Sequence, residues 1–245
     1  MKIYIPTVGR VGKQRVADYL RYCRIPYQLV VRPDETKAHG DHPVLVCKER
    51  GIRATRQWLL DRHKADKLLI FDDDLTFWWR TRDGKKFIKC DMDPTPMKLM
   101  VKEIEHYLNK YAHGGIVEKF MSQSRPRGTV HGGRYFQVLA YNTALFPTPK
   151  PRMRVEIGED MDMNLQLLYA GKQNFILTEY TKTDKEWSPG GCCMMGRNEK
   201  TLYEQSAKLA KLHPGVVTLK DEKKEGTHNW LKISWRKAQK LGGLR

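Results

Sequence analysis

Three consecutive aspartates, Asp72 to Asp74, follow one of the most apolar short runs of the chain, in the stretch KLLIFDDDLTFWW. Adjacent carboxylates repel one another, and burying an ionised carboxylate without a partner costs several kcal/mol. A cation would offset this cost, and carboxylate oxygens are the ligands that Mg²⁺ or Mn²⁺ prefers. Because side chains alternate along an extended segment, we expect Asp72 and Asp74 to share the ion and Asp73 to point away. A solvated acidic turn is the alternative.

A second acidic pair, Glu159 and Asp160, opens the stretch GEDMDMNLQLLYAG, whose pattern predicts a helix with Asp160 at or near the N-cap and Gly171 at the C-terminal cap. The helix dipole stabilises an ionised carboxylate at this position, so one interpretation is a plain cap. The other is a general base, which has to stay ionised near neutral pH and reach an acceptor hydroxyl. The sequence leaves both open.

Cationic side chains near the first strand are candidates for binding a phosphate-bearing ligand. The stretch TVGRVGKQ, residues 7–14, lacks the spacing of an ATPase phosphate loop and carries Gln14 where Ser or Thr would bind magnesium. Its backbone amides and Arg10 remain candidates for contact with a nucleotide. Arg53 and Arg56, three residues apart on one face of an expected helix, are further candidates, with surface salt bridges as the alternative.

The charge of the chain points to an anionic partner. Lys and Arg outnumber Asp and Glu by 45 to 28, for a formal net charge of +17. Residues 125–154 contain six Lys or Arg and no acidic residue, and residues 226–245 contain five and none. Such segregation favours nucleic acid as the partner over charge that serves solubility alone. We take Arg125, Arg127 and Arg134 as the candidates for contact with a nucleic-acid backbone.

The spacing of apolar residues predicts an α/β fold. Apolar strands alternate with helices up to the aspartates, which is typical of a parallel sheet covered on both faces. Ligands bind such sheets at the carboxyl ends of the strands, where Asp72 to Asp74 fall. The expected strands are 2–6, 27–31, 44–47, 68–71, 77–79, 87–89, 116–121, 135–141 and 175–180, with a hairpin turn at Asp83-Gly84 and a loop at 190–196. The expected helices are 16–23, 52–62, 96–109, 160–170 and 199–212.

Three segments together resemble the landmarks of GT-A fold glycosyltransferases: the opening IYIPTVGR, an Asp-x-Asp at the end of a buried strand, and GEDMDMNLQLL. Within that class, GIRATRQWLL, FDDDL, a Gly-Gly-Cys loop near Gly190 and the basic character are most similar to phage TET-associated glycosyltransferases. This resemblance implies a Rossmann-like mixed sheet with flanking helices and an antiparallel extension on the acceptor side. It also implies one domain over 1–245, in which residues 1–80 bind the nucleotide sugar and 81–245 bind the acceptor and end in a basic tail.

The same resemblance implies a metal-dependent transfer of sugar from a nucleoside-diphosphate sugar, with a UDP-sugar as the first candidate, to 5-hydroxymethylcytosine in double-stranded phage DNA. Pro6 and Thr7 would border the nucleoside, Asp72 and Asp73 would lie at the donor, and Asp74 would bind Mn²⁺ or Mg²⁺. Asp160 would deprotonate the acceptor, with Glu159 shaping the site beside it.

Two departures from the family pattern bear on these roles. Three aspartates stand where the motif needs two, so their division of labour stays open. The Q-x-x-R-W signature of processive polysaccharide synthases is missing. A C-terminal histidine that folds back onto the metal is the minority interpretation for His228, and His131 is left unassigned.

Two other functions compete with this interpretation. Asp72, Asp74 and Asp160 could hold two ions in a nuclease or nucleotidyltransferase. A basic nucleic-acid-binding module is the non-enzymatic alternative, but it leaves the aspartates unexplained. Five cysteines, an odd number, and the lack of a membrane-length apolar run predict a cytoplasmic protein with reduced thiols, in the host cytoplasm if a phage encodes it. We expect no membrane contact and no obligate protein partner.

Overall fold

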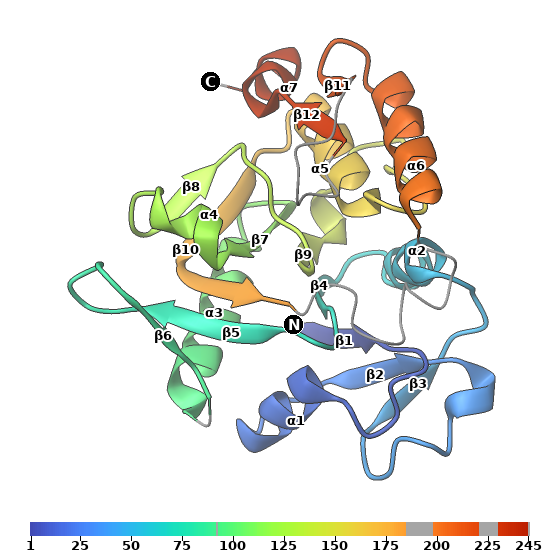
Figure 1. Ribbon diagram of the computed structural model, residues 1–245, viewed down its shortest axis with the longest axis vertical. Coiled ribbons are helices and arrows are strands. Elements are labelled where there is room, and N and C mark those ends of the chain that lie inside the picture. The colour runs from blue at the N-terminus through green and yellow to red at the C-terminus, as the bar shows by residue number, and fades with distance from the viewer. Residues whose placement is uncertain (92, 185–197, 221–229, 245) are drawn as a thin grey trace.

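The computed structural model describes residues 1–91, 93–184, 198–220 and 230–244. These residues form one large mixed sheet with helices on both faces, together with a small two-stranded sheet (Figure 1). The large sheet has ten strands in the order β3-β2-β1-β4-β9-β7-β10-β5-β6, and β8 pairs with β10. The predicted α/β class, with its mixed sheet and antiparallel extension, is therefore confirmed.

The N-terminal part of the sheet is parallel. Its strands are β1 (Lys2–Pro6), β2 (Gln28–Val31), β3 (Val44–Val46) and β4 (Lys67–Phe71). Alternate residues of these strands enter opposite cores, so Ile3 and Ile5 pack on one face of the sheet and Tyr4 on the other. Strands buried on both faces read as continuous apolar runs, which explains why the sequence predicted them well.

Antiparallel pairing begins where β4 meets β9 (Val138–Asn142). The remaining strands of the large sheet are β5 (Thr76–Arg80), β6 (Phe87–Lys89), β7 (His113–Glu118), β8 (Thr129–His131) and β10 (Asn174–Thr183). The predicted hairpin is present, with β5 and β6 paired around Gly84 at φ 75°.

Helices cover the two faces in pairs. Helices α1 (Arg15–Tyr22) and α3 (Pro94–Tyr107) supply buried residues to the core on one face, and α2 (Ile52–Arg62) and α5 (Glu159–Tyr169) supply the other. The short elements are α4 (Lys119–Gln123) and the 3-10 turns η1 (Pro33–Glu35) and η2 (Thr143–Leu145). Of the described helices, none is long and apolar enough to cross a membrane.

The described part of the basic C-terminal region is folded rather than an extended tail. It consists of α6 (Glu199–Leu212), β11 (Val217–Leu219), β12 (Leu231–Ile233) and α7 (Trp235–Leu241). Together with Leu165 and Leu168 of α5, these elements form a third apolar cluster. Beside it, the fully buried carboxylate of Asp162 accepts hydrogen bonds from Arg154 and pairs with His213 at 2.9 Å.

Three predicted boundaries are wrong for local reasons. The strand predicted over 116–121 ends at Glu118, because residues 119–123 form α4. The strand predicted over 135–141 begins at Val138, because Gln137 adopts φ 63°. Helix α5 begins at Glu159, one residue before the predicted start, with Gly158 at φ 85° as the N-cap; Asp160 lies near the N-cap as expected, and Gly171 at φ 71° follows the end of the helix.

Candidate active site at the carboxyl edge of the sheet

Two neighbouring parallel strands bring the first polar groups together. β1 ends at Pro6 and β4 ends at Phe71, so Thr7 and Asp72 to Asp74 follow at the same edge of the sheet. The Thr7 hydroxyl donates to Asp73 Oδ2 at 2.5 Å, and both side chains are buried. Pro6, the last residue of β1, is also buried, and the Thr7 N–H donates to the Val30 carbonyl at 3.0 Å.

Arg10 neutralises two of the three aspartates. Its guanidinium donates to Asp73 in a close contact and lies 3.0 Å from Asp74 Oδ2. Burial nevertheless raises the pKa of Asp73 to about 6. Because one guanidinium nitrogen contacts both carboxylates, the expectation that Asp73 points away from Asp74 is wrong. The extended conformation ends at Phe71, and Asp73 and Asp74 lie in a turn.

Asp72 makes its ion pair with a different arginine. Arg56 of α2, 3% exposed, donates through Nη2 to Asp72 and through Nη1 to Glu159 of α5. One buried guanidinium therefore joins the two acidic motifs that the sequence singles out. Desolvation raises the pKa of the partly exposed Asp72 and of the buried Glu159 above the ordinary range, because the attraction of the shared guanidinium does not offset it.

Asp160 lies beside this buried group but is more accessible. Its side chain is partly exposed, whereas Glu159 is buried at 5% exposure. Asp160 Oδ1 accepts the backbone N–H of Met161 at 2.7 Å, and its charge acts on Arg56, Asp72 and Glu159. The first turn of α5 thus presents one carboxylate to the interior and a second toward solvent.

Gln137 and Lys182 form part of the same edge, and the sequence reasoning missed both. The Gln137 carbonyl accepts the backbone N–H of Asp72 at 2.9 Å, from a left-handed conformation that side chains rarely adopt. The ammonium of Lys182, fully buried on β10, donates to the Gln137 side chain and lies 3.4 Å from Glu118. Lys182 lies beyond the strand predicted over 175–180, in the polar end of β10, so no apolar pattern marked it.

A cleft opens next to Asp74. Its volume is about 710 Å³, within the range of small-molecule sites. Arg10, Gln14, Tyr19, Asp74, Phe77 and Lys89 are among the lining residues. The Gln14 Oε1 atom is buried and has no hydrogen-bond partner. The cleft therefore joins cationic, aromatic and carboxylate groups at the point where β4 ends.

Comparison with known protein families identifies the class of enzyme. The model of the TET-associated glycosyltransferase family matches residues 1–191. The chain belongs to this family. It is therefore a glycosyltransferase, and the part of it beyond residue 191 lies outside the family match. No curated protein matches the chain in sequence.

Two of the solved structures that the chain matches are both at TM-scores below 0.5. One is a CMP:2-keto-3-deoxy-manno-octonic acid synthetase complexed with CTP, with 9% sequence identity and a TM-score of 0.43. The match covers 72% of this chain and 88% of the synthetase chain. The other is a putative glucose-1-phosphate thymidylyltransferase from Bacillus anthracis in complex with sucrose, at 13% identity and TM-score 0.31, covering 99% and 95%.

The other arginine candidates of this glycosyltransferase have contacts of their own. Arg53 shares α2 with Arg56 but pairs with Glu156 at 2.5 Å, which is the salt-bridge alternative. The half-buried Arg125 lies against Gly133, and burial lowers its pKa. The Arg134 guanidinium covers the Phe136 ring at 4.3 Å.

Three further residues complete the set of sequence-based assignments. Arg127 forms an ion pair with Glu179 at 2.9 Å. His131 stacks on Tyr111 with ring centroids 5.2 Å apart, which gives it a packing role. His228 and the loop at 190–196 lie outside the described residues.

Proposed function

We propose that this glycosyltransferase moves a sugar from a nucleoside-diphosphate sugar to the hydroxymethyl group of 5-hydroxymethylcytosine in DNA. The observation that carries the proposal is the Arg56 bridge between Asp72 and Glu159. It fixes the aspartate cluster next to the first turn of α5, so that a donor bound at one and a base at the other would lie side by side. Family membership supports the reaction class.

The cleft beside Asp74 is the candidate donor site. Its volume of about 710 Å³ suits a nucleotide sugar, and Arg10 is one of its lining residues. A UDP-sugar is our first candidate donor. Arg10 supplies positive charge where the diphosphate would lie, since it already reaches Asp73 and Asp74.

A divalent cation fits the chemistry of this edge. Asp72 and Asp74 offer hard carboxylate oxygens and are partly exposed, so we infer that they would hold Mn²⁺ or Mg²⁺. Within the described residues no group of three or more His, Cys, Asp or Glu is arranged for a metal ion. Magnesium commonly uses one or two carboxylates together with substrate phosphates, which matches a pair of aspartates. When bound, the ion would neutralise the charge that develops on the leaving diphosphate.

Asp160 is the candidate base. Glu159 is buried, is held by Arg56 and has a raised pKa, which suits it to position the helix rather than to exchange protons with a ligand. Asp160 is partly exposed at the same helix terminus. Its carboxylate would take the proton from the acceptor hydroxyl as that oxygen forms a bond to the anomeric carbon, and the bond to the diphosphate breaks.

A nuclease or nucleotidyltransferase activity is the competing function. A two-metal site needs a carboxylate that bridges the ions. The described residues contain no group of three or more His, Cys, Asp or Glu side chains of the kind that two ions would need. Nothing in the arrangement of these residues favours phosphoryl transfer over glycosyl transfer.

The test is the mass of nucleosides recovered from DNA after incubation with a panel of UDP-sugars and Mn²⁺. We expect a sugar-sized increase on 5-hydroxymethylcytosine DNA and none on unmodified DNA. Asp160→Asn should reduce the rate at least about 100-fold, the usual contribution of a general base, while Asp41→Asn, which is exposed and does not line the cleft, should not. Unchanged turnover in Asp160→Asn, or product only with nucleoside triphosphates, would refute the proposal.

A further inference from the structure

The β5–β6 hairpin is a basic arm that starts at the candidate active site. β5 begins two residues after Asp74, and Figure 1 shows the hairpin turn projecting from one side of the molecule, far from α6. Arg82, Lys85 and Lys86 of the turn offer three positive charges. The one acidic residue of the turn, Asp83, caps it by accepting hydrogen bonds from the Thr81 hydroxyl and the Lys85 N–H.

The base of the hairpin is held by a buried arginine. Arg80, 6% exposed, donates to the carbonyl of Ser122 at 2.7 Å and to the carbonyls of Thr178 and Gly84 at 3.4 Å each. Its guanidinium also faces the Phe87 ring at 4.8 Å. Burying a cation is costly, and these carbonyls offset the cost only while the hairpin keeps this position. Arg80 therefore fixes the direction of the arm.

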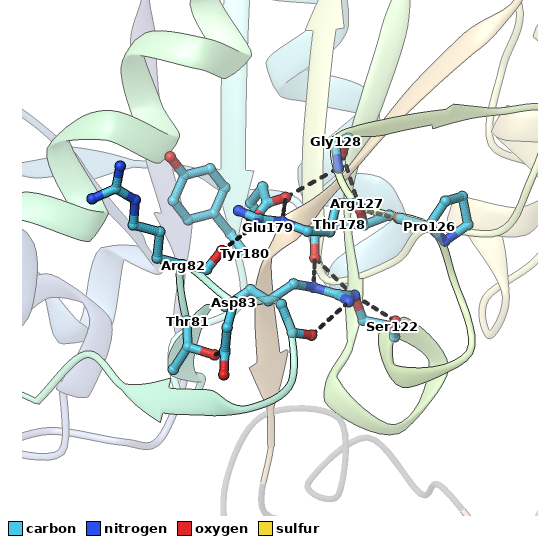
Figure 2. A network of polar contacts seen from close by, with 12 residues as sticks. Thr81, Arg82, Asp83, Ser122, Pro126, Arg127, Gly128, Thr178, Glu179 and Tyr180 are labelled. Carbon is cyan, nitrogen blue, oxygen red and sulfur yellow. Dashed lines mark hydrogen bonds and ion pairs between the residues drawn. The ribbon is translucent and has the colours of Figure 1, made fainter.

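A second brace involves Arg127, one of the residues assigned to DNA contact. Its guanidinium forms two hydrogen bonds with Glu179, at 2.9 and 3.1 Å, and also donates to the Arg82 carbonyl, as Figure 2 shows. Bidentate pairs of this kind are geometrically restrictive. Arg127 thus connects the hairpin turn to β10, and the side chains left to meet an external anion are those of the turn itself.

We propose that the β5–β6 hairpin is a docking arm for double-stranded DNA, which places the duplex beside the transfer site. This inference rests on the proposed function for its acceptor. A two-stranded β-ribbon fits the major groove, and exposed Lys and Arg at its tip would contact phosphates. The five residues of β5 span about 17 Å, close to the length of five base pairs. The arm therefore binds the duplex about half a helical turn from the reacting base.

An exposed aromatic residue adjoins the base of the arm. Phe120 of α4 is 68% exposed, the highest value among the large hydrophobic side chains that the structure describes. It lies between Glu118, which contacts Lys182, and Ser122, which accepts from Arg80. A phenylalanine at this position could enter the base stack beside a base turned out toward the site, as apolar side chains do in other DNA complexes. This placement agrees with duplex DNA as the ligand.

The test uses the full chain with Arg82→Gln, Lys85→Gln and Lys86→Gln combined, and fluorescence anisotropy of a labelled duplex at several salt concentrations. If the three residues contact phosphates, the slope of log affinity against log salt should fall by about 2 to 3. The matched control combines Lys200→Gln, Lys208→Gln and Lys211→Gln on α6, which removes the same charge far from the arm (Figure 1). The control should change the slope by less than about 1.

A second measurement separates docking from chemistry. Sugar transfer to free 5-hydroxymethyl-2′-deoxycytidine should be equal for the wild type and the hairpin variant, while transfer to duplex DNA should fall at least about tenfold in the variant. If the wild type transfers no sugar to any acceptor, the proposed function fails, yet the salt slopes still decide the docking arm. Equal slopes for the hairpin and α6 variants would overturn the docking proposal, whatever the outcome for catalysis.

Discussion

Replacing Arg56 by methionine should expose the energetic role of the buried bridge. The substitution keeps an unbranched side chain of similar length but removes the cation that pairs with Asp72 and Glu159. Removing one partner of a buried ionic group leaves uncompensated charge, at a cost of about 3 to 5 kcal/mol. For a chain of 245 residues this corresponds to a fall in melting temperature of about 6 to 20 °C. The loss should grow with pH, because both carboxylates can become neutral in acid.

Urea unfolding at pH 5 and pH 8 measures this loss directly. A triple variant in which Arg56→Met is combined with Asp72→Asn and Glu159→Gln removes every charge of the bridge. Because neutral replacement of a whole buried ionic group is often tolerated, the triple variant should recover most of the stability. It should remain inactive, since Asp72 belongs to the proposed donor site.

Arg53→Met is the matched control on the same helix. Arg53 is partly exposed and pairs with Glu156 on the surface, so its removal should cost less than about 1 kcal/mol. Equal losses for the Arg53 and Arg56 variants would refute the bridge as a stabilising element. Failure of the triple variant to recover stability would show that Arg56 acts through packing rather than through charge.

Two further substitutions probe the edge of the sheet. Burial raises the pKa of Asp73 to about 6, so the contribution of this group to the free energy of unfolding is complete below pH 4 and falls by about 3 kcal/mol as the pH rises through 6. Relative to the wild type, Asp73→Asn should therefore gain stability between pH 4 and pH 8 in urea titrations. A difference in stability that stays constant over this range would contradict this. Gly115→Ala places a Cβ 2.2 Å from the Val138 carbonyl and should cost about 3 kcal/mol in thermal unfolding, whereas Gly12→Ala, with open space but φ 70°, should cost about 1.

Apolar periodicity correctly predicted the helices and strands whose apolar pattern is regular along their whole length. The bounds of α2 and α6 match the predicted helices 52–62 and 199–212, and the parallel strands coincide within one residue. The prediction failed at β7, which starts with His113 followed by two glycines. Those glycines admit the carbonyls of Phe175 and Val138 at distances that exclude a Cβ, so close packing rather than side-chain pattern makes the strand.

The candidate site was predictable in composition but not in pairing. The two acidic motifs could be located because their strand and helix are regular. That Arg56 rather than Arg53 joins them depends on which of two neighbouring arginines the packing of α2 buries, and one helical turn separates the two residues. Gln137 escaped notice because its role comes from its backbone conformation, which no sequence pattern of this type signals.

The folded C-terminal region gives the enzyme a second support for the helix that carries Glu159 and Asp160. Leu165 and Leu168 pack against residues of α6 and α7, while His213 engages Asp162 three residues after Glu159. Removing the chain from residue 198 onward would expose Leu165 and Leu168 to solvent. It would also remove His213, which leaves Arg154 to pair with the carboxylate of Asp162. We therefore expect a shortened chain that ends with the family match to hold the first turn of α5, which carries the proposed base Asp160, less rigidly.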